Sequence, residues 1–416
     1  MKMKLRIQQR MPLDSLLLWV AVFCVSTYAL IEHMSISIVE VSAIKLPLLY
    51  LGGLCMLPKL GLFFKRLKKK RYFYVIGVLL IFCVLIYISA RHGAASSIGS
   101  TSVRPAVRLI LYLVELFLLM IWLAEVGWGR RFLNFLFHYV LILTLVTDLL
   151  LFSRLIVFSN GDFESFLVGT KFTVSYFHMN LLTLWTMRRA DQTYSDRRAR
   201  RVLIIGVPVV ALVSIYVDCM TGVLGCLVLV VLFFLFGKTG MKKLVYLNSP
   251  VVLLAAMVAS VAFPFLAEQI VSVPFVTYVV ETVLGRNSSL TGRMNIFGMF
   301  GRQMEGNWLW GFGFGNGNAA SVELFGYANA QNALLNWILQ TGIPATMLFV
   351  LLMLTVFHFL SKSKNITRSM PLVILVYVYT ILGAVEVTFS MSFILWIAVI
   401  YLFVNEDAQP KKTEET

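Results

Sequence analysis

The chain has 416 residues, of which 59 % are hydrophobic and 13 % are charged, and its mean hydropathy is +0.84. A soluble domain cannot bury so much apolar surface, so this composition excludes a soluble globular protein and indicates an all-α, polytopic integral membrane protein. The net charge of +16 would also suit a nucleic-acid-binding protein, but the basic residues lie in blocks between apolar runs, and no nucleic-acid partner is expected.

Twelve apolar runs are long enough, or nearly so, to cross a bilayer. They are residues 13–31, 44–63, 72–90, 105–125, 132–152, 173–188, 202–217, 220–237, 247–266, 343–361, 370–388 and 391–405. Most of the 36 Lys and Arg residues lie in alternate connections, as cytoplasmic loops do. We therefore expect about 12 transmembrane helices in the plasma membrane, with both termini in the cytoplasm.

Three regions follow from these runs. Residues 1–200 contain the first six helices, residues 201–405 contain the others, and residues 406–416 form a polar cytoplasmic tail. Very short turns divide 202–237 and 370–405, so each of these ranges should fold as an antiparallel hairpin.

The five cysteines form no CxxC pair and lie mostly in apolar runs, so neither a metal site nor a cofactor is expected.

The longest extracytoplasmic loop covers residues 267–330. A loop of this length with its own apolar pattern is usually functional. Its Phe, Trp, Leu and Ile residues recur at helical spacings. We therefore expect short helices that pack on the membrane face.

Three arginines lie in this loop: Arg286, Arg293 and Arg302. If Ser289 or Thr291 caps a helix, Arg293 lies in its first turn, where its charge opposes the helix dipole but suits an anion near free N–H groups. Arg302 then lies on the opposite face, because each residue turns the helix by about 100°. All three could instead contact lipid headgroups.

The stretch WLWGFGFGNGNAAS has glycines at alternate positions, including Gly311 and Gly313. It has neither the GxGxxG spacing nor the Lys-Ser/Thr pair of a nucleotide-binding loop. It is expected to be a flexible turn. Its tryptophans and phenylalanines would lie at the lipid interface or stack on sugar rings.

A helix is predicted from Ala333 onward, with a break at Gly342-Ile343-Pro344 before it continues as a membrane span. Gln331 and Asn332 lie at its start. Their uncharged amides suit hydrogen bonds with hydroxyl groups, but such residues also cap helices.

The order TGRMNIF, WLWGFGFGNG and ANAQNALLNWILQTGIP resembles the signature of the O-antigen ligase and polymerase family, which includes the Wzy-type polysaccharide polymerases. The resemblance covers residues 200–400, most strongly 290–345. The matching residues are Gly292-Arg293, Gly311, Gly313, Asn332, Leu335 and Thr341-Gly342-Ile343.

Two positions depart from the family pattern. Gln331 replaces the usual histidine, and an amide cannot accept a proton as a general base does. Thr221-Gly222 stands where ligases tend to have Ser-Arg, so a second phosphate-binding arginine is missing there. Arg154 or Lys171 could replace it. These departures favour a polymerase over a ligase.

The resemblance implies transfer of a glycan from undecaprenyl diphosphate to an incoming repeat unit on the outer membrane face. Arg293 would bind the diphosphate, assisted by Arg286, Arg154 or Lys171, and Gln331 and Asn332 would orient the acceptor sugar. Arg302, Gly311, Gly313 and His178 are further candidates for substrate binding. The general base is open between His178 and the loop glutamates Glu268, Glu281, Glu305 and Glu323.

Other features of the predicted site also remain open. His178 could instead be a packed, hydrogen-bonded helix residue, and Glu386 could pair with an arginine. The implied partners are the lipid-linked oligosaccharide, membrane lipid, and a flippase and chain-length regulator.

Two other classes of function are left open. An O-antigen-type ligase would use the same donor. A flippase or other transporter of the lipid-linked oligosaccharide would line a cavity with charged residues and tend toward internal repeats. Few charges lie within the apolar runs, chiefly Glu115 and Asp148, and no repeat is evident. Nothing in the sequence favours a receptor or structural subunit.

Overall fold

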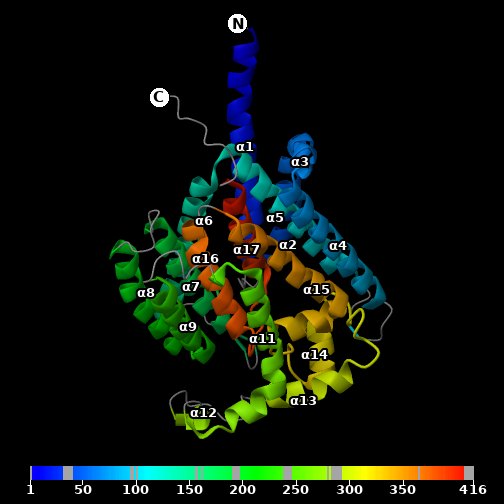
Figure 1. Ribbon diagram of the computed structural model, residues 1–416, viewed down its shortest axis with the longest axis vertical. Helices are drawn as coiled ribbons and strands as arrows, with labels where there is room; N and C mark the ends of the chain where they lie inside the picture. The colour runs from blue at the N-terminus through cyan, green and yellow to red at the C-terminus, as the bar shows by residue number, and fades with distance from the viewer. Residues whose placement is uncertain are drawn as a thin grey trace.

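The computed structural model describes residues 2–30, 41–93, 98–99, 102–154, 158–160, 163–189, 197–237, 246–278, 281–282, 293–363 and 366–406. Within these ranges the protein is a bundle of helices, most of them long and steeply inclined in the same sense (Figure 1). The expected all-α membrane fold is therefore confirmed.

The elements of the first half include one short 3-10 helix, η1. They are α1 (Lys2–Leu30), α2 (Val41–Met56), η1 (Leu57–Lys59), α3 (Leu60–Leu67), α4 (Lys70–Gly93), α5 (Arg104–Val126), α6 (Gly129–Ser153), β1 (Phe158–Asn160), β2 (Phe163–Phe166), β3 (Gly169–Thr170) and α7 (Lys171–Arg189).

The second half is helical throughout its described elements. They are α8 (Arg197–Tyr216), α9 (Met220–Gly237), α11 (Pro250–Val271), α12 (Pro274–Tyr278), α13 (Arg293–Gln303), α14 (Gly317–Phe325), α15 (Ala333–Ser361), α16 (Ile366–Leu382) and α17 (Met391–Glu406).

Within the described ranges, seven helices are long and apolar enough to cross a membrane. They are Leu13–Leu30, Ile44–Leu67, Lys70–Gly93, Arg104–Val126, Gly129–Ser153, Pro250–Ala267 and Ala333–Ser361. Four apolar helices are shorter: Arg201–Tyr216, Met220–Phe233, Ser369–Leu382 and Met391–Glu406. The remaining predicted span, 173–188, falls within α7. The count of twelve crossings stays a prediction.

α17 is the central helix of the bundle, and all its residues from Phe393 to Asn405 are buried. Because a helix that is apolar all round must be covered on every side, this sequence suits only a central position. α5 and α15 pack against α17, and α4 lies along α15 (Figure 1). The predicted hairpins α8–α9 and α16–α17 are present as packed helix pairs.

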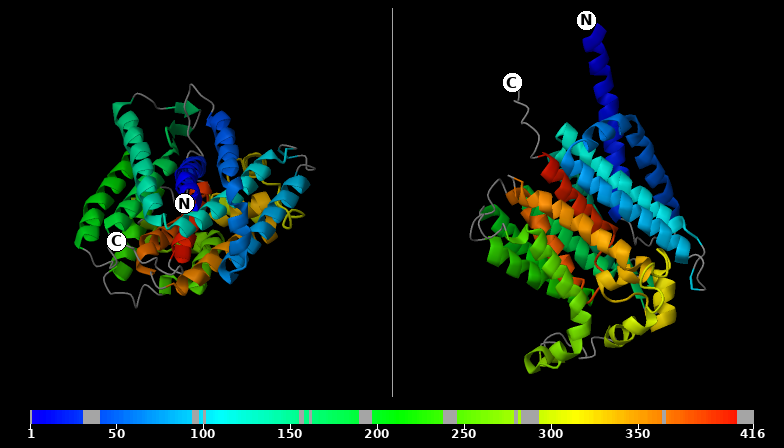
Figure 2. Two further views of the ribbon diagram at one scale, coloured as in Figure 1. Left: turned by 90° about the horizontal axis from the view of Figure 1, so that it is seen from above. Right: turned by 45° about the vertical axis from the view of Figure 1, so that its right-hand side comes forward.

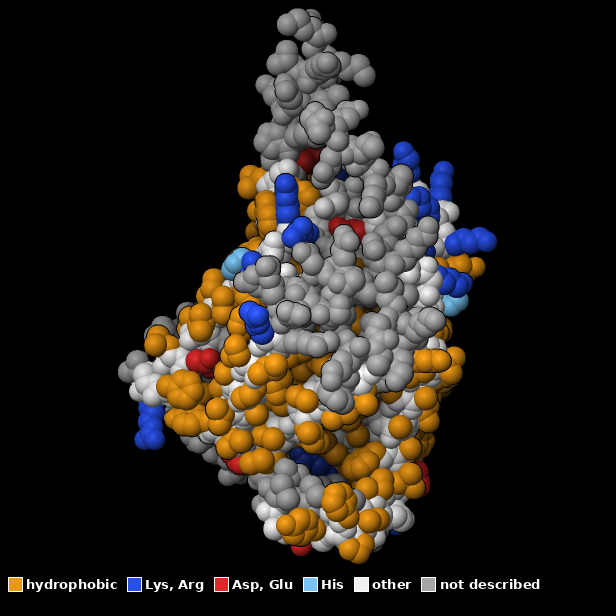
Figure 3. Space-filling view, turned by 60° about the vertical axis from the view of Figure 1, so that its left-hand side comes forward, with side chains coloured by type: hydrophobic (Ala, Val, Ile, Leu, Met, Phe, Trp, Pro, Cys, Tyr) orange, Lys and Arg blue, Asp and Glu red, His pale blue; other side chains and the backbone are white. Residues whose placement is uncertain are grey.

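Large apolar side chains cover much of the outside of the bundle (Figure 3). Examples are Leu149 on α6, Ile204 and Leu212 on α8, and Val251 on α11, all of which are exposed. An apolar surface of this extent is what lipid contact requires. On the face shown, most described Lys and Arg side chains lie toward the end from which α1 extends.

The end of the bundle opposite the start of α1 has its own small core. There α13 packs on α14, and α14 packs on α15 (Figures 1 and 2). Phe297, Phe300, Phe312 and Phe325 are buried in this outer core. The expectation of short helices in the loop 267–330 is therefore confirmed.

Two details differ from the sequence predictions. β1, β2 and β3 form a small antiparallel sheet between α6 and α7, in a connection for which no strand was expected. Gly161 and Asp162 separate the paired Asn160 and Phe163 in the sequence, and Gly-Asp is a hairpin signal that was overlooked. In addition, α16 ends at Leu382 rather than at residue 388.

Candidate functional site

The connection between α16 and α17 brings the two predicted motif regions together. Residues 383–385 present three consecutive carbonyl groups. The backbone N–H of Ala333 donates to the first at 2.8 Å, the side-chain amide of Asn332 to the second at 3.2 Å, and Nε of Arg293 to the third at 2.8 Å. The starts of α13 and α15 are thus fixed to the same short segment.

Arg293 is the first residue of α13 and forms an ion pair with Glu386. Its Nη2 lies 3.5 Å from Oε2 of Glu386, and the two side chains are 18 % and 6 % exposed. The alternative that Glu386 pairs with an arginine is therefore confirmed. The ion pair compensates the unfavourable position of a cation at a helix N-terminus.

Glu386 lies in the connection after α16, and its carboxylate also accepts a hydrogen bond from the backbone N–H of Val387 at 3.0 Å. Burial raises the pKa of Glu386 above its ordinary value, while the charges of Arg293 and Lys171 act in the opposite direction. Glu386 is thus a buried acid under the influence of two cations from different elements.

Tyr176 of α7 is a further polar residue of this region, and the sequence did not indicate it. It interacts electrostatically with both Glu386 and Arg293, and its ring lies against Tyr379 with 5.3 Å between centroids. Its buried hydroxyl has no hydrogen-bond partner among the described residues. The only available signal was its position two residues before His178.

Asn332 is fully buried and caps α15. Its Oδ1 accepts hydrogen bonds from the backbone N–H groups of Leu334 and Leu335, and its Nδ2 donates to the carbonyls of Ser260 and Ala384. The capping alternative is what the structure shows. Because both ends of the amide are already bonded, we no longer expect Asn332 to orient an acceptor sugar.

Gln331 is half-buried and adopts a left-handed backbone conformation with φ of 53°. Such a conformation is uncommon for a residue with a side chain and costs energy unless the surroundings hold it. Here the backbone N–H of Gln331 donates to Oδ1 of Asn329 at 2.9 Å. Gln331 therefore remains a candidate for contact with a substrate.

His178 is buried, and both nitrogens of its ring are occupied. Nδ1 lies 2.8 Å from the carbonyl of Val174, and Nε2 lies 3.2 Å from Oδ2 of Asp148. The carbonyl of Val174 accepts a hydrogen bond from Nδ1, so neither ring nitrogen is left without a partner. The alternative of a packed, hydrogen-bonded helix residue therefore agrees with the structure.

The remaining predicted anion ligands lie in different environments. Lys171 pairs with Asp218 at 3.2 Å between Nζ and Oδ2. Arg154 is exposed at the end of α6. Arg302 is exposed in the last turn of α13. Because α13 is continuous, Arg302 lies on the opposite face of the helix from Arg293, as expected. Arg286 and the predicted capping residues lie outside the described residues.

The loop glutamates whose side chains the structure describes are on the surface. Glu281, Glu305 and Glu323 are exposed, and the side chain of Glu268 lies outside the described residues. None of them has a described hydrogen bond or ion pair with Arg293.

The glycine run is a tightly packed seam rather than the flexible turn that we expected. Gly311 and Gly313 have φ values of 63° and 91°, and a Cβ atom on Gly311 would lie 2.7 Å from the carbonyl oxygen of Leu339. The backbone N–H of Phe312 donates to this same carbonyl at 2.8 Å. The glycines thus permit the loop backbone to lie against α15, which corrects the expectation of a flexible turn.

The aromatic residues of the seam also differ in environment. Phe312 is buried in the outer core, so it neither lies at a lipid interface nor stacks on a sugar. Trp308 is exposed, and the half-buried Trp310 lies beside His92 of α4. For these two tryptophans, both contact with the lipid interface and stacking on sugar rings remain predictions.

Within the described part of the chain, no three His, Cys, Asp or Glu side chains are grouped as a metal site requires. In comparisons with known proteins, neither a family model nor a curated protein matches this chain. The polymerase and ligase resemblance therefore rests on the three sequence motifs.

Proposed function

We propose that the protein is a polymerase of lipid-linked oligosaccharide repeat units for a capsule, exopolysaccharide or O-antigen. Its twelve predicted helices would cross the plasma membrane with both termini in the cytoplasm. The main support is the convergence of Arg293 and Asn332 on the 383–386 segment. Their motifs carry the family resemblance, although they lie far apart in the sequence.

The proposed reaction requires few protein groups. The acceptor hydroxyl oxygen bonds to the anomeric carbon of the donor glycan. The bond from that carbon to the diphosphate oxygen breaks, and its electron pair leaves with undecaprenyl diphosphate. The hydroxyl proton passes to a base. A guanidinium stabilises the charge that develops on the leaving diphosphate through two parallel hydrogen bonds.

Arg293 is the residue to which we assign this role. Its partial exposure leaves it within reach of a ligand, and the ion pair with Glu386 fixes the direction of its side chain. Glu386 is a positioning residue in this scheme. Gln331 would contact the acceptor sugar, and Lys171 would add positive charge near Glu386.

The test is elongation of lipid-linked repeat units by purified protein in vesicles. Arg293→Ala should abolish elongation, and Arg293→Lys should reduce it by at least about 10-fold, because an ammonium cannot form the bidentate contact. Arg104→Ala removes an exposed arginine from the start of α5 and should retain the parent rate. Unchanged elongation by Arg293→Ala would refute the assigned role.

The same assay distinguishes the other functions. A ligase would transfer the glycan to a different acceptor without forming longer lipid-linked glycans. A flippase would move the lipid-linked sugar across the vesicle membrane without any elongation, and the proposal would then be wrong.

A further inference from the structure

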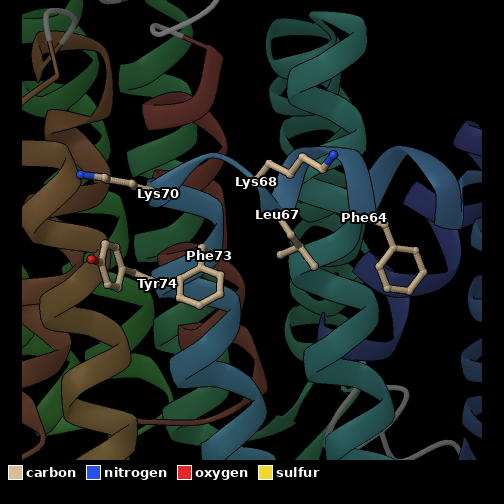
Figure 4. Close-up of a pocket in the computed structure, with 6 residues that line it drawn as sticks. All are labelled: Phe64, Leu67, Lys68, Lys70, Phe73 and Tyr74. Carbon is tan, nitrogen blue, oxygen red and sulfur yellow. The ribbon is translucent and has the colours of Figure 1, made fainter.

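A pocket of about 520 Å³ opens on the outside of the bundle between α3 and α4. Figure 4 shows its two walls, each containing one lysine and two apolar or aromatic side chains. The lining residues are Phe64, Leu67 and Lys68 on the α3 side and Lys70, Phe73 and Tyr74 on the α4 side. The pocket thus combines positive charge with an apolar lining.

The apolar lining is well exposed. Phe64 is 68 % exposed, Phe73 61 % and Tyr74 52 %. The large apolar side chains Leu57 and Leu60 beside them are exposed as well. In a membrane protein such side chains lie against acyl chains, so the apolar side of the pocket is at the depth of lipid.

In the described part of the chain, no acidic side chain neutralises the two lysines of the pocket. Two nearby basic residues have acidic partners: Arg66 pairs with Glu125, and Lys59 pairs with Asp14. Lys68 and Lys70 are exposed and have no acidic partner among the described residues. Two cations beside exposed apolar side chains at a helix end are complementary to an anionic headgroup with an acyl chain.

We propose that this pocket binds one anionic glycerophospholipid from the leaflet at the α3–α4 end of the bundle. Lys68 and Lys70, whose side chains extend in opposite directions (Figure 4), attract the anionic headgroup by their charge, and an acyl chain runs along Phe64, Phe73 and Tyr74. The lipid would also fill the space between the projecting helix α3 and α4. This inference does not depend on the polymerase proposal.

Native mass spectrometry of the full-length protein from mixed micelles tests it, with phosphatidylglycerol and phosphatidylcholine of equal chain length as probes. The parent should retain one phosphatidylglycerol in preference to phosphatidylcholine. Lys68→Gln with Lys70→Gln should lower phosphatidylglycerol occupancy by about 10-fold, because each basic side chain near the membrane surface adds attraction for anionic lipid. Phe73→Ser should weaken retention of both lipids.

The matched control is Arg130→Gln with Arg131→Gln, which removes two exposed charges at the start of α6, away from the pocket. It should change occupancy by less than about 2-fold if the pocket, rather than the general positive charge, binds the lipid. An equal loss in both double variants would overturn the proposal. Equal retention of phosphatidylcholine by the parent, or displacement of the lipid by inorganic phosphate, would also overturn it.

Discussion

At the scale of single residues, Arg293 occupies a position that its own helix disfavours. The positive end of the α13 dipole meets a guanidinium there, which an isolated helix would avoid. Glu386 and the carbonyl of Val385 compensate it from another part of the chain. The arginine is therefore held by tertiary contacts, and its orientation depends on them.

Glu386→Gln tests this dependence. The substitution keeps the shape of the side chain and part of its hydrogen bonding but removes the charge. We expect elongation to fall by roughly 10-fold, since loss of one partner of a buried ion pair leaves the other uncompensated. The elongation rates of parent and variant in vesicles are the measurement.

The pH dependence provides a second measurement on the same variant. Burial raises the pKa of Glu386, so as the pH falls its carboxylate gains a proton earlier than an ordinary glutamate does. The ion pair with Arg293 is then lost, and the parent rate should decline on the acidic side. The variant has no such group and should lack this decline. Identical pH profiles would contradict the positioning role of Glu386.

Asn332 offers a prediction about stability. Asn332→Ala removes the cap of α15 and leaves buried carbonyl groups without their donor. We expect the free energy of unfolding to fall by about 2 kcal/mol or more. Asn318→Ala is the control, because Asn318 is exposed and makes one side-chain hydrogen bond, to Ala328. Chemical denaturation in detergent micelles compares them, and equal stability of the two variants would be incompatible with the capping role.

At the scale of elements, the glycine seam joins the outer core to the membrane helices. The backbone N–H of Ile343 donates to the carbonyl of Trp308, and the hydroxyl of Ser89 donates to the carbonyl of Trp310. The bend at Gly342 and the end of α4 therefore enclose the seam from two sides. The glycines of the seam are needed because the loop backbone lies too close to these helices to leave room for side chains.

Gly311→Ala should therefore destabilise the protein, because the new methyl group meets the backbone of α15 and the backbone has a positive φ. We expect a loss of about 1 to 3 kcal/mol. Gly301→Ala is the matched control. A Cβ atom on Gly301 would meet nothing within 4 Å on the exposed face of α13. Alanine there should therefore raise the free energy of unfolding, by at most about 1 kcal/mol. Relative to the parent, the unfolding temperature should fall for Gly311→Ala and rise for Gly301→Ala. A shift of both in the same direction would argue against a packed seam.

The helices could be predicted because hydropathy and glycine or proline breaks are local properties of the chain. The break in α15 is the clearest case, since Gly342 has φ of 75° and ψ of 175° where the sequence indicated an interruption. The candidate site could be predicted only in part. Arg293 was identified from its motif, and Glu386 was considered as the partner of an arginine. Which arginine it pairs with could not be predicted across 93 residues, and Tyr176 carries no motif of its own.

At the scale of the whole molecule, the described start of α1 and the end of α17 lie at the same end of the bundle (Figures 1 and 2). α13 and α14 lie at the other end. Chain ends on one side require an even number of crossings, which agrees with the twelve that we predict. The large excess of basic residues in alternate connections sets the expected orientation, with the α3–α4 turn in the cytoplasm.

Single cysteine labelling in cells tests this orientation. The five native cysteines are all buried and should react poorly with a membrane-impermeant maleimide, so the parent gives the background. Glu323→Cys places an exposed thiol on α14, and Lys68→Cys places one at the α3–α4 turn. Glu323→Cys should be labelled in intact cells, whereas Lys68→Cys should be labelled only after permeabilisation. Labelling of both in intact cells would place the two ends on one side of the membrane, and the reverse pattern would invert the topology. The first result would bring the α3–α4 turn onto the extracytoplasmic face. The second would remove α13 and Arg293 from that face, which the proposed reaction requires.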